Sequence, residues 1–308
     1  MTREEINEEQ QKKVAREKNL EHTKKILLFS IKWFLIASVI IISFVAYTAY
    51  ISSVKIEVRE YRITNSKIPK SFDGIKILHF SDLHYGSTMF EDNVEQLKEM
   101  INDRKPDIIV FTGDLISKEY KISKDEKEKL SNILKELHAS LGKYAILGDE
   151  DDLELSTLFN QGDFILLKNE YDLIFNDDTN PILLVGLSSS LAGEQNIDQG
   201  YAYFSQESYN SEIFTILMTH EPDVTSEIQN TYSNTNLILA GHSHNGTIRT
   251  PINHLPIDRK KDAYKYNQEY YDLGDTKLYV SGGLGTSGTF AFRLFCRPSF
   301  NLYRLSSK

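Results

Sequence analysis

The chain has 308 residues, 40% of them hydrophobic, which is enough for one large domain with a real core or for two small ones. Its 35 basic and 44 acidic residues give a net charge of −9, which argues against nucleic-acid binding because phosphate backbones require clustered Lys and Arg. The single cysteine, Cys296, excludes an intrachain disulfide and is more typical of a small core residue than of a nucleophile.

The N-terminal fifty residues divide into a polar part and an apolar part. Residues 1–25 are almost all charged or amide-bearing, and we expect them to form a polar cytoplasmic tail. Residues 26–51 follow, and from Trp33 onward they are uncharged for long enough to cross about 30 Å of hydrocarbon as a helix. Trp33 and Tyr47, near opposite ends, fit the aromatic belts of a membrane interface. The sequence therefore predicts one transmembrane anchor.

A cleaved signal peptide is the competing interpretation of this segment. It would have a shorter charged leader, a shorter apolar core and a small-residue cleavage site, and this sequence shows none of them. The positive charges on the two sides are nearly balanced, but a short tail before a large domain favours a cytoplasmic N-terminus. We expect a single-pass protein of the cell membrane whose remaining domain, 55–308, is extracytoplasmic.

The first half of this domain alternates strands with amphipathic helices. Residues 54–64 alternate apolar and polar positions, which predicts a strand with one exposed face. Three apolar runs then predict core strands, and the segments between them predict helices, the second ending at Gly142. This βαβαβ order predicts a parallel, buried sheet. The strands are 74–80, 106–114 and 143–149, and the helices are 93–105 and 124–142.

The second half is richer in strands. Two strands are expected around a turn at 176–180, and a helix at 223–230 lies between two further apolar runs. We therefore predict that 55–308 forms one layered α/β domain with two sheets. The expected strands are 163–175, 181–189, 213–220, 235–244, 277–288 and 293–305.

Metal-binding residue types follow each of the core strands. Ligands in open α/β sheets bind outside the carboxyl ends of the strands, and residues two apart in an extended segment share a face. Imidazole with carboxylate suits Mn²⁺, Fe²⁺ or Zn²⁺, and there are too many such groups for one ion. They could hold two ions about 3.5–4 Å apart with one carboxylate between them. The residues are Asp82, His84, Asp114, Asp149, His220, His242 and His244.

Taken singly, an Asp or His at a strand end is often only a turn former or a satisfied polar group. Five such endings in one domain favour the metal interpretation. The order of the motifs then becomes informative. The stretches "SDLHYG", "TGDL", "LGDED", "THEP" and "GHSHNG" resemble, in order and spacing, the five blocks D-x-H, G-D, G-N-H-D/E, H and G-H-x-H of the calcineurin-like metallophosphoesterases.

The resemblance, which includes the membrane-associated bacterial branch of that family, implies a fold and a reaction. The fold is an αββα four-layer sandwich of two mixed β-sheets, here preceded by one N-terminal transmembrane helix. The reaction is hydrolysis of a phosphodiester, phosphomonoester or pyrophosphate bond by a metal-activated hydroxide. The implied cofactors are two divalent ions, with Mn, Fe or Zn favoured. The implied partner is a phosphate-ester substrate, which the anchor makes attractive as a lipid-linked or envelope compound; no nucleic acid is expected.

The resemblance also assigns roles by position. It implies that Asp114 bridges the two ions. One ion would be held by Asp82, His84, Asp114 and His244, and the other by Asp114, Asp149, His220 and His242. Two neighbouring positions depart from the branch: Asn245 stands where Gly is frequent, and Gly282 where Arg is frequent.

The acidic loop departs further, because Gly148-Asp149-Glu150-Asp151 replaces G-N-H-D. Asp149 presents an oxygen at the same reach as the usual Asn. Glu150 stands where the family has a His that contacts phosphate and is thought to protonate the leaving oxygen. As a general acid Glu150 would need a raised pKa. We take Glu150 and Asp114 as the candidate catalytic residues.

Three alternatives remain open at this stage. The chain could be a metal-binding or sensing protein that has lost turnover through the changed loop, or a scaffold that only presents a surface. The acidic run could also serve the fold, with Asp151 or Asp152 capping the helix that follows and complementing its dipole.

Overall fold

The computed structural model describes residues 3–47, 55–177, 179–207, 209–250, 252, 255–257, 260–288 and 292–307. The chain separates into two compact units, Met1–Ile51 and Ser52–Lys308. Each unit is described by itself.

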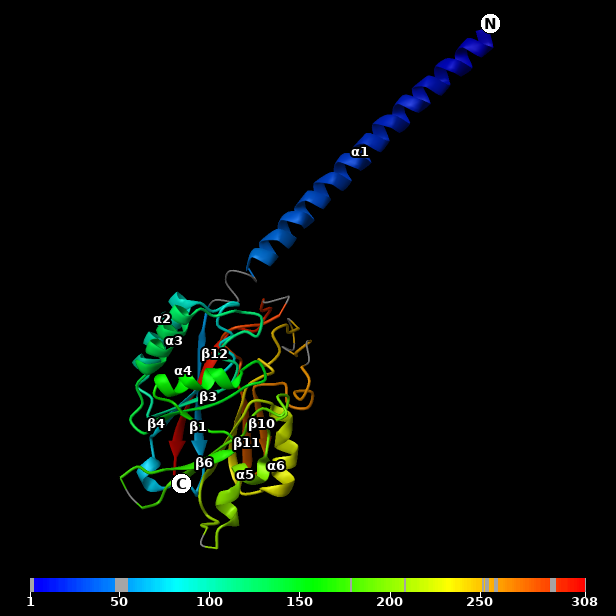
Figure 1. The fold of residues 1–308 in the computed structure, drawn as a ribbon. Helices are drawn as coiled ribbons and strands as arrows, with labels where there is room; N and C mark the ends of the chain where they lie inside the picture. Colours follow the sequence, from blue (N-terminus) through cyan, green and yellow to red (C-terminus); the bar gives the residue numbers. More distant parts are fainter. Residues whose placement is uncertain are drawn as a thin grey trace. The chain divides into compact units, whose positions relative to one another are not determined.

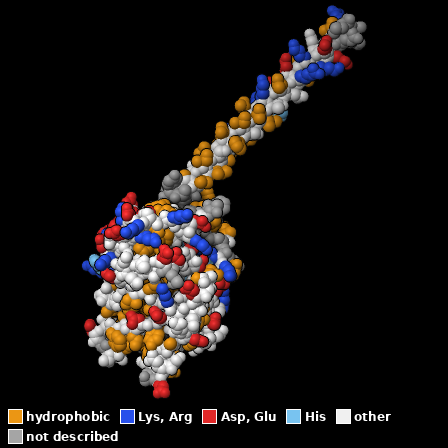
Figure 2. Space-filling model, in the orientation of Figure 1, with side chains coloured by type: hydrophobic (Ala, Val, Ile, Leu, Met, Phe, Trp, Pro, Cys, Tyr) orange, Lys and Arg blue, Asp and Glu red, His pale blue; other side chains and the backbone are white. Residues whose placement is uncertain are grey.

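The first unit is one continuous helix, α1 (Arg3–Tyr47). The expected polar tail and most of the expected span thus share a single helix, while 48–51 lie outside the described residues. Hydrophobic side chains cover its C-terminal half and charged ones its N-terminal half (Figure 2). By length and composition, the segment Ile6–Tyr47 is long and apolar enough to cross a membrane.

The second unit contains two six-stranded sheets packed face to face, with helices on both outer faces (Figure 1). The predicted αββα sandwich is confirmed. In spatial order, the first sheet contains β1 (Glu57–Thr64), β12 (Ser299–Ser306), β2 (Lys76–Phe80), β3 (Ile108–Thr112), β4 (Gly142–Ile146) and β5 (Ile165–Leu166). The second contains β10 (Tyr270–Leu273), β11 (Thr276–Val280), β9 (Thr235–Ala240), β8 (Thr215–Thr219), β7 (Ile182–Gly186) and β6 (Glu170–Ile174).

Both sheets are mixed. Strands β2, β3, β4 and β5 are parallel, as the βαβαβ order predicts, whereas β12 lies antiparallel to β2 and parallel to β1. In the second sheet β7, β8, β9 and β11 are parallel, and the edge strands β6 and β10 are antiparallel to their neighbours. The predicted strand pair around 176–180 is the β6–β7 hairpin.

Helices cover the two outer faces. The first sheet is covered by α2 (Glu91–Asp103), α3 (Lys124–Lys135) and α4 (Ser156–Gln161), and the second by α5 (Ile197–Gly200) and α6 (Thr225–Thr231) (Figure 1). Short 3₁₀ turns occur at Lys70–Phe72, Leu153–Leu155, Ala202–Ser205 and Pro222–Val224.

The end of α3 corrects one sequence prediction. The helix begins as expected, because Ser123 and Glu126 cap it reciprocally. It ends at Lys135, seven residues before the predicted stop. Gly142 instead begins β4, where it pairs with Ile108 in a backbone conformation with φ +130°. The chain needs the intervening residues to return from the helix to the start of the next strand.

The continuous apolar character of the core strands follows from burial on both faces. Along β3, Ile108 and Val110 pack into the core between the sheets, while Ile109 and Phe111 pack under the helices. Cys296 is buried, as expected for a small core residue. Two apolar layers therefore hold the ends of β2, β3, β4, β8 and β9 rigidly, and the predicted polar residues follow those ends.

Candidate metal centre

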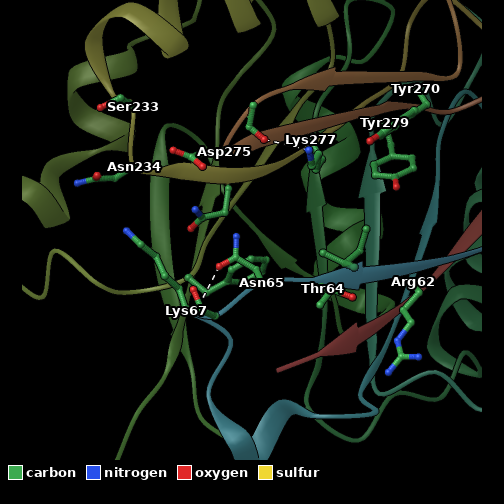
Figure 3. A pocket seen from close by; sticks show the side chains of 15 residues that line it. Arg62, Thr64, Asn65, Lys67, Ser233, Asn234, Tyr270, Asp275, Lys277 and Tyr279 are labelled. Carbon is green, nitrogen blue, oxygen red and sulfur yellow. Dashed lines mark hydrogen bonds between the residues drawn. The ribbon is translucent and has the colours of Figure 1, made fainter. Parts of the chain in front are cut away.

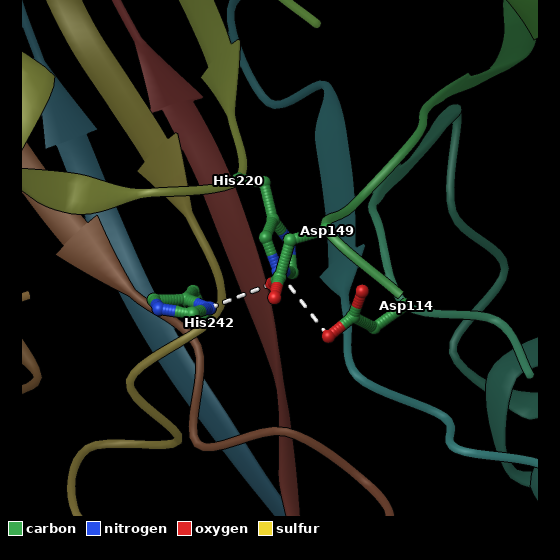
Figure 4. Close-up of side chains that lie close together, drawn as sticks. All are labelled: Asp114, Asp149, His220 and His242. Carbon is green, nitrogen blue, oxygen red and sulfur yellow. Dashed lines mark hydrogen bonds and ion pairs between the residues drawn. The ribbon is translucent and has the colours of Figure 1, made fainter. Parts of the chain in front are cut away.

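Two groups of side chains converge beyond the carboxyl ends of these strands. Ligand atoms of the first group, Asp114, Asp149, His220 and His242, all lie within 4.8 Å of one another (Figure 4). His220 Nε2 is 3.0 Å from Oδ1 of Asp149 and 3.3 Å from Oδ2 of Asp114, and His242 Nδ1 is 3.0 Å from the same Asp149 oxygen. The four residues come from the loops after β3, β4, β8 and β9.

The second group contains Asp82, His84 and His244, again with ligand atoms within 4.8 Å. His244 Nε2 is 3.0 Å from Oδ1 of Asp82, and His84 Nε2 is 3.7 Å from Oδ2 of Asp114. Asp114 therefore lies between the groups. The structure brings all seven predicted ligand positions to one place, together with Glu150, which forms a further group with His84 and Asp114.

The backbone at these positions is strained. Asp82, His84, Asp114, His242 and His244 have φ values of 50°, 45°, 62°, 62° and 51°. Residues other than Gly adopt this left-handed conformation uncommonly, although Asn, Asp and His do so more often than the rest, and it costs about 1–3 kcal/mol per residue. The sharp turn after each strand aims consecutive side chains inward. Such clustered strain is typical of functional sites.

Backbone carbonyls fix the orientation of two histidines. His220 Nδ1 lies 2.6 Å from the carbonyl oxygen of Thr112, and His242 Nε2 lies 2.8 Å from that of Lys261. Since a carbonyl only accepts, these ring nitrogens carry the protons. In the neutral rings the other nitrogens, His220 Nε2 and His242 Nδ1, are left to bind a metal ion beside the carboxylates, which is how metal-binding histidines are commonly held.

Two observations test whether divalent ions fit here. The Nε2 atoms of His84 and His244 lie 3.2 Å apart, a separation at which two neutral imidazoles can bind one ion through these nitrogens. The set is also chemically suitable, because four imidazoles and three carboxylates match first-row divalent ions. Six of the seven side chains are buried, so a charge-balancing cation is needed to offset the loss of solvation. The residues present fit two such ions.

The charges of the cluster are strongly coupled. Burial disfavours the ionised form of Asp82, but His244 outweighs it and holds the pKa of that carboxyl group well below its usual range. Burial likewise disfavours the charged form of His220, but Asp114 and Asp149 raise the pKa of that imidazole. The carboxylates can therefore bind cations without first losing protons, whereas a protonated His220 must release a proton before its Nε2 can bind a metal ion.

Comparison with known sequences decides the family. The family described as calcineurin-like phosphoesterase matches residues 75–246, more than half of the chain. The chain belongs to the calcineurin-like phosphoesterases. It is thus a metal-dependent phosphoric ester hydrolase by family, and its seven converging side chains stand at the motif positions.

Relatives of this phosphoesterase come from several bacteria. It is 30% identical to the uncharacterized metallophosphoesterase YkuE of Bacillus subtilis, with 85% of this chain and 89% of the relative covered. It is 30% identical to an uncharacterized metallophosphoesterase of Aquifex aeolicus, with 82% and 93% covered. It is 26% identical to the UDP-2,3-diacylglucosamine pyrophosphatase LpxG of Chlamydia trachomatis, with 61% and 69% covered.

The acidic loop of the phosphoesterase has three distinct parts. Asp149 and Glu150 are the more accessible members of the cluster, with side chains 26% and 18% exposed. Asp151 instead accepts the backbone N–H groups of Asp114, Leu115 and Gly148 at 2.8, 2.8 and 2.9 Å. Of the two predicted helix caps, Asp152 is confirmed, because its Oδ1 accepts the N–H of Leu155. Asp151 is not a cap and ties two strand ends together.

Glu150 is held against His84. Its Oε2 lies 3.3 Å from His84 Nδ1 and accepts the N–H of Lys118 at 3.1 Å, and its Oε1 accepts the hydroxyl of Ser287 at 2.7 Å. Burial favours the neutral form of Glu150, but His84 and Ser287 outweigh it and lower the pKa of this carboxyl group. This is the opposite of the raised pKa that a general acid in its place requires.

Two groups near the cluster were missed from the sequence. Lys260 Nζ lies 3.2 Å from His244 Nε2, and Ser287 supports Glu150. Neither belongs to a motif block, and each lies in a loop without apolar periodicity. The basic run around Lys260 and the Ser- and Gly-rich stretch around Ser287 were the only available signals.

The two departures from the bacterial branch touch each other. Asn245 is fully buried, and its side-chain amide has no hydrogen-bond partner among the described residues. A Cβ built on Gly282 would lie 3.5 Å from Nδ2 of Asn245 and closer to Oγ of Ser299 than van der Waals contact allows. A side chain at Gly282 therefore requires the hydroxyl group of Ser299 to move, whereas the contact with Asn245 is an ordinary one.

We expect Gly282→Ala to destabilise this phosphoesterase by about 1–3 kcal/mol, because the new methyl group overpacks against Ser299. Thermal unfolding followed by far-UV circular dichroism measures the effect. Adding Ser299→Ala should restore part of the loss. Equal stability of Gly282→Ala and the native chain would contradict this account.

A separate depression of about 640 Å³ lies at the opposite ends of the strands (Figure 3). Its lining includes Phe214, which precedes β8, and Asn234, which precedes β9, whereas the metal-binding groups follow those strands. Lys67 and Lys277 at its edge are engaged with Glu212 and Asp272. None of the seven candidate ligands lines it, so it is a separate feature from the metal centre.

Proposed function

We propose that this chain is a membrane-anchored dinuclear phosphoesterase that hydrolyses a phosphodiester or pyrophosphate bond in a substrate bearing an apolar group. The observation that carries the proposal is the convergence of two ligand groups on a shared Asp114. The length and apolar character of α1 support anchoring. The orientation that we propose, with the tail inside and the catalytic unit outside the cell, rests on the short tail that precedes a large domain. The name of the relative LpxG supports a pyrophosphate bond in a lipid-like molecule.

In this proposal each ligand group would hold one divalent ion, and Asp114 would contribute to both sites. Asp82, His84 and His244 complete one site, and Asp149, His220 and His242 complete the other. Two bound ions supply Lewis acidity toward the phosphate and toward the attacking water. The chain's own residues position these groups: Thr112 and Lys261 orient two imidazoles, and the strained strand ends hold the carboxylates.

Glu150 has a positioning role in this proposal. Its carboxylate faces Nδ1 of His84, which leaves the Nε2 lone pair directed at the ion site. Proton donation to the leaving group then falls to solvent. A substrate with a good leaving group, such as a pyrophosphate or an activated diester, tolerates this best, because losing one general acid typically costs about 10²–10⁴-fold in rate.

The test of the proposed function uses the full chain purified in detergent. Metal-stripped protein should not hydrolyse bis-p-nitrophenyl phosphate, and added Mn²⁺ should restore turnover because the ions supply most of the activation. Retention of two ions without turnover on this diester, on pyrophosphates or on monoesters would instead support the metal-binding or sensing alternative. Absence of bound metal would contradict both.

Glu150→Gln separates positioning from proton donation. The amide keeps the size of the side chain but removes the charge beside His84, so we expect metal affinity to fall about 10–100-fold. Isothermal titration with Mn²⁺ measures this directly. Ser287→Ala removes only one contact of Glu150 and should have a smaller effect of the same kind. Unchanged metal affinity with a slower reaction on poor leaving groups would instead indicate a general acid.

A further inference from the structure

A loop of exposed apolar side chains follows the last metal-binding motif. Arg249 and Pro256 form an antiparallel bridge, and the N–H of Ile257 donates to the carbonyl of Ile248 at 2.9 Å. Between and beside these contacts, Ile252 is 86% exposed, Leu255 47% and Ile257 61%. Single exposed apolar residues are normal, but several large ones in one short loop mark a contact surface.

A second segment adds to this surface. Ile248 also bridges Leu294, and the backbones of Thr247 and Leu294 are hydrogen-bonded at 2.8 Å, so the segment before Cys296 lies against the loop. Phe295 in this segment is 39% exposed and has φ 55°. That conformation is a clear outlier for a bulky residue and is retained where function requires it. We call Ile252, Leu255, Ile257 and Phe295 the apolar rim.

The apolar rim adjoins the metal centre through the chain on both sides. His244 precedes the loop by a few residues, and Lys260 follows it and returns to within 3.2 Å of His244 Nε2. Lys261, the next residue, is exposed and gives its carbonyl to His242 at 2.8 Å. One loop therefore carries candidate metal ligands, the ammonium group of Lys260 and the exposed apolar side chains of the rim.

We propose that the apolar rim inserts into the surface of a lipid bilayer and presents phosphate-bearing lipids to the metal centre. This inference rests on the proposed function and adds that the substrate is a lipid reached at the surface of a bilayer. Exposed Lys261 and Arg297 flank the rim, and their charges complement anionic headgroups although the whole chain is acidic. An apolar surface with basic residues at its edge is the pattern of interfacial binding.

The tether makes the bilayer the available partner. Only residues 48–56 separate α1 from β1, and an extended chain of that length spans about 30 Å at most. With α1 in the membrane, the catalytic unit remains permanently within reach of lipid headgroups. The tether thereby supplies a high local concentration of surface, so even a small apolar rim suffices for contact.

The chain contains one tryptophan, Trp33, which permits a direct test. The full chain with Trp33→Phe and Ile252→Trp is reconstituted into nanodiscs of phosphatidylglycerol, with or without bromine on the acyl chains. Bromine quenches on contact, so we expect the fluorescence to fall about two-fold or more with brominated lipid, as for a side chain buried among acyl chains. Equal fluorescence in the two lipids would overturn the proposal.

Phe175→Trp in the same Trp33→Phe background is the matched control, because Phe175 is similarly apolar and 51% exposed but follows β6, away from the rim. It should not be quenched. Equal quenching at both positions would show only that the catalytic unit lies near the bilayer, and it would overturn the proposal. Trp fluorescence that depends on protein concentration and not on lipid would indicate contact with a second copy of the chain, and it would also overturn the proposal. Leu255→Trp provides a second position if the first variant does not fold.

An activity assay tests the proposal independently of the fluorescence measurement. Ile252→Ser with Ile257→Ser should raise KM for a phosphate-bearing lipid in nanodiscs by about ten-fold, while kcat/KM for bis-p-nitrophenyl phosphate stays unchanged. Equal KM values for the lipid would count against the proposal. Quenching requires no turnover, so a protein that is quenched but inactive refutes the proposed function and not the lipid contact. A chain that fails to enter nanodiscs refutes the anchor itself.

Discussion

Asp114→Asn should abolish phosphoester hydrolysis and reduce the retained divalent ions from about two to about one per chain. Asp114 Oδ2 lies 3.3 Å from His220 Nε2 and 3.7 Å from His84 Nε2, so one carboxylate belongs to both ligand groups. An amide is neutral and offers one oxygen. Changes beyond the direct ligands typically cost about 10–100-fold, and loss of a shared ligand should exceed that range.

The measurement combines metal content after gel filtration with hydrolysis of bis-p-nitrophenyl phosphate. Asp103→Asn is the matched control, because Asp103 is exposed at the end of α2 and lies outside the metal-binding groups. It should retain both ions and full activity. Thermal unfolding checks that Asp114→Asn remains folded. A folded Asp114→Asn variant with two ions and native activity would refute the shared-ligand role.

Asp151→Ala should cause the largest loss of stability among single changes in the acidic loop. Its carboxylate accepts three backbone N–H groups, those of Asp114, Leu115 and Gly148. Each buried donor left unpaired costs about 1–3 kcal/mol, so the total should reach about 3 kcal/mol or more. For a domain of this size that lowers Tm by roughly 6–12 °C.

Asp152→Ala is the control for this prediction. Asp152 accepts only the N–H of Leu155, at 3.2 Å, and removing such a cap costs about 1 kcal/mol. Far-UV circular dichroism should follow the melting, because the single tryptophan, Trp33, lies in α1 and does not report on the catalytic unit. If the two alanine variants have the same Tm, the stability of the strand ends does not depend on Asp151.

Motif spacing predicted the centre well because strand ends are geometrically regular. Asp82 and His84, two residues apart after a buried strand, were expected to point to one place along an extended backbone; the structure brings them together, but through left-handed backbone with φ values of 50° and 45°. The parallel sheet followed from apolar runs that only two-sided burial explains. In both cases a short local pattern determines the three-dimensional position.

The remaining features depend on contacts that no local pattern encodes. Lys260 reaches His244 across a loop of irregular sequence, so its position follows from tertiary packing. Asp151 is a residue type that often caps helices, but parallel β3 and β4 place three strand-end N–H groups within reach of its carboxylate. Helix α3 ends early because β4 must begin in register with β3.

The pairing of β1 with β12 has a consequence for how the protein is made. Within the described residues, β1 is the edge strand of its sheet and its ladder partner is β12, over the eight residues Glu57–Thr64 and Ser299–Ser306. During synthesis the chain emerges N-terminus first, so β1 must wait until more than 200 further residues have been made before it can pair with β12. A ribosome stalled before Ser299 would leave β1 with an unpaired strand edge, and the sheet would close only after β12 has been made. The order of strands thus couples closure of the first sheet to the synthesis of β12.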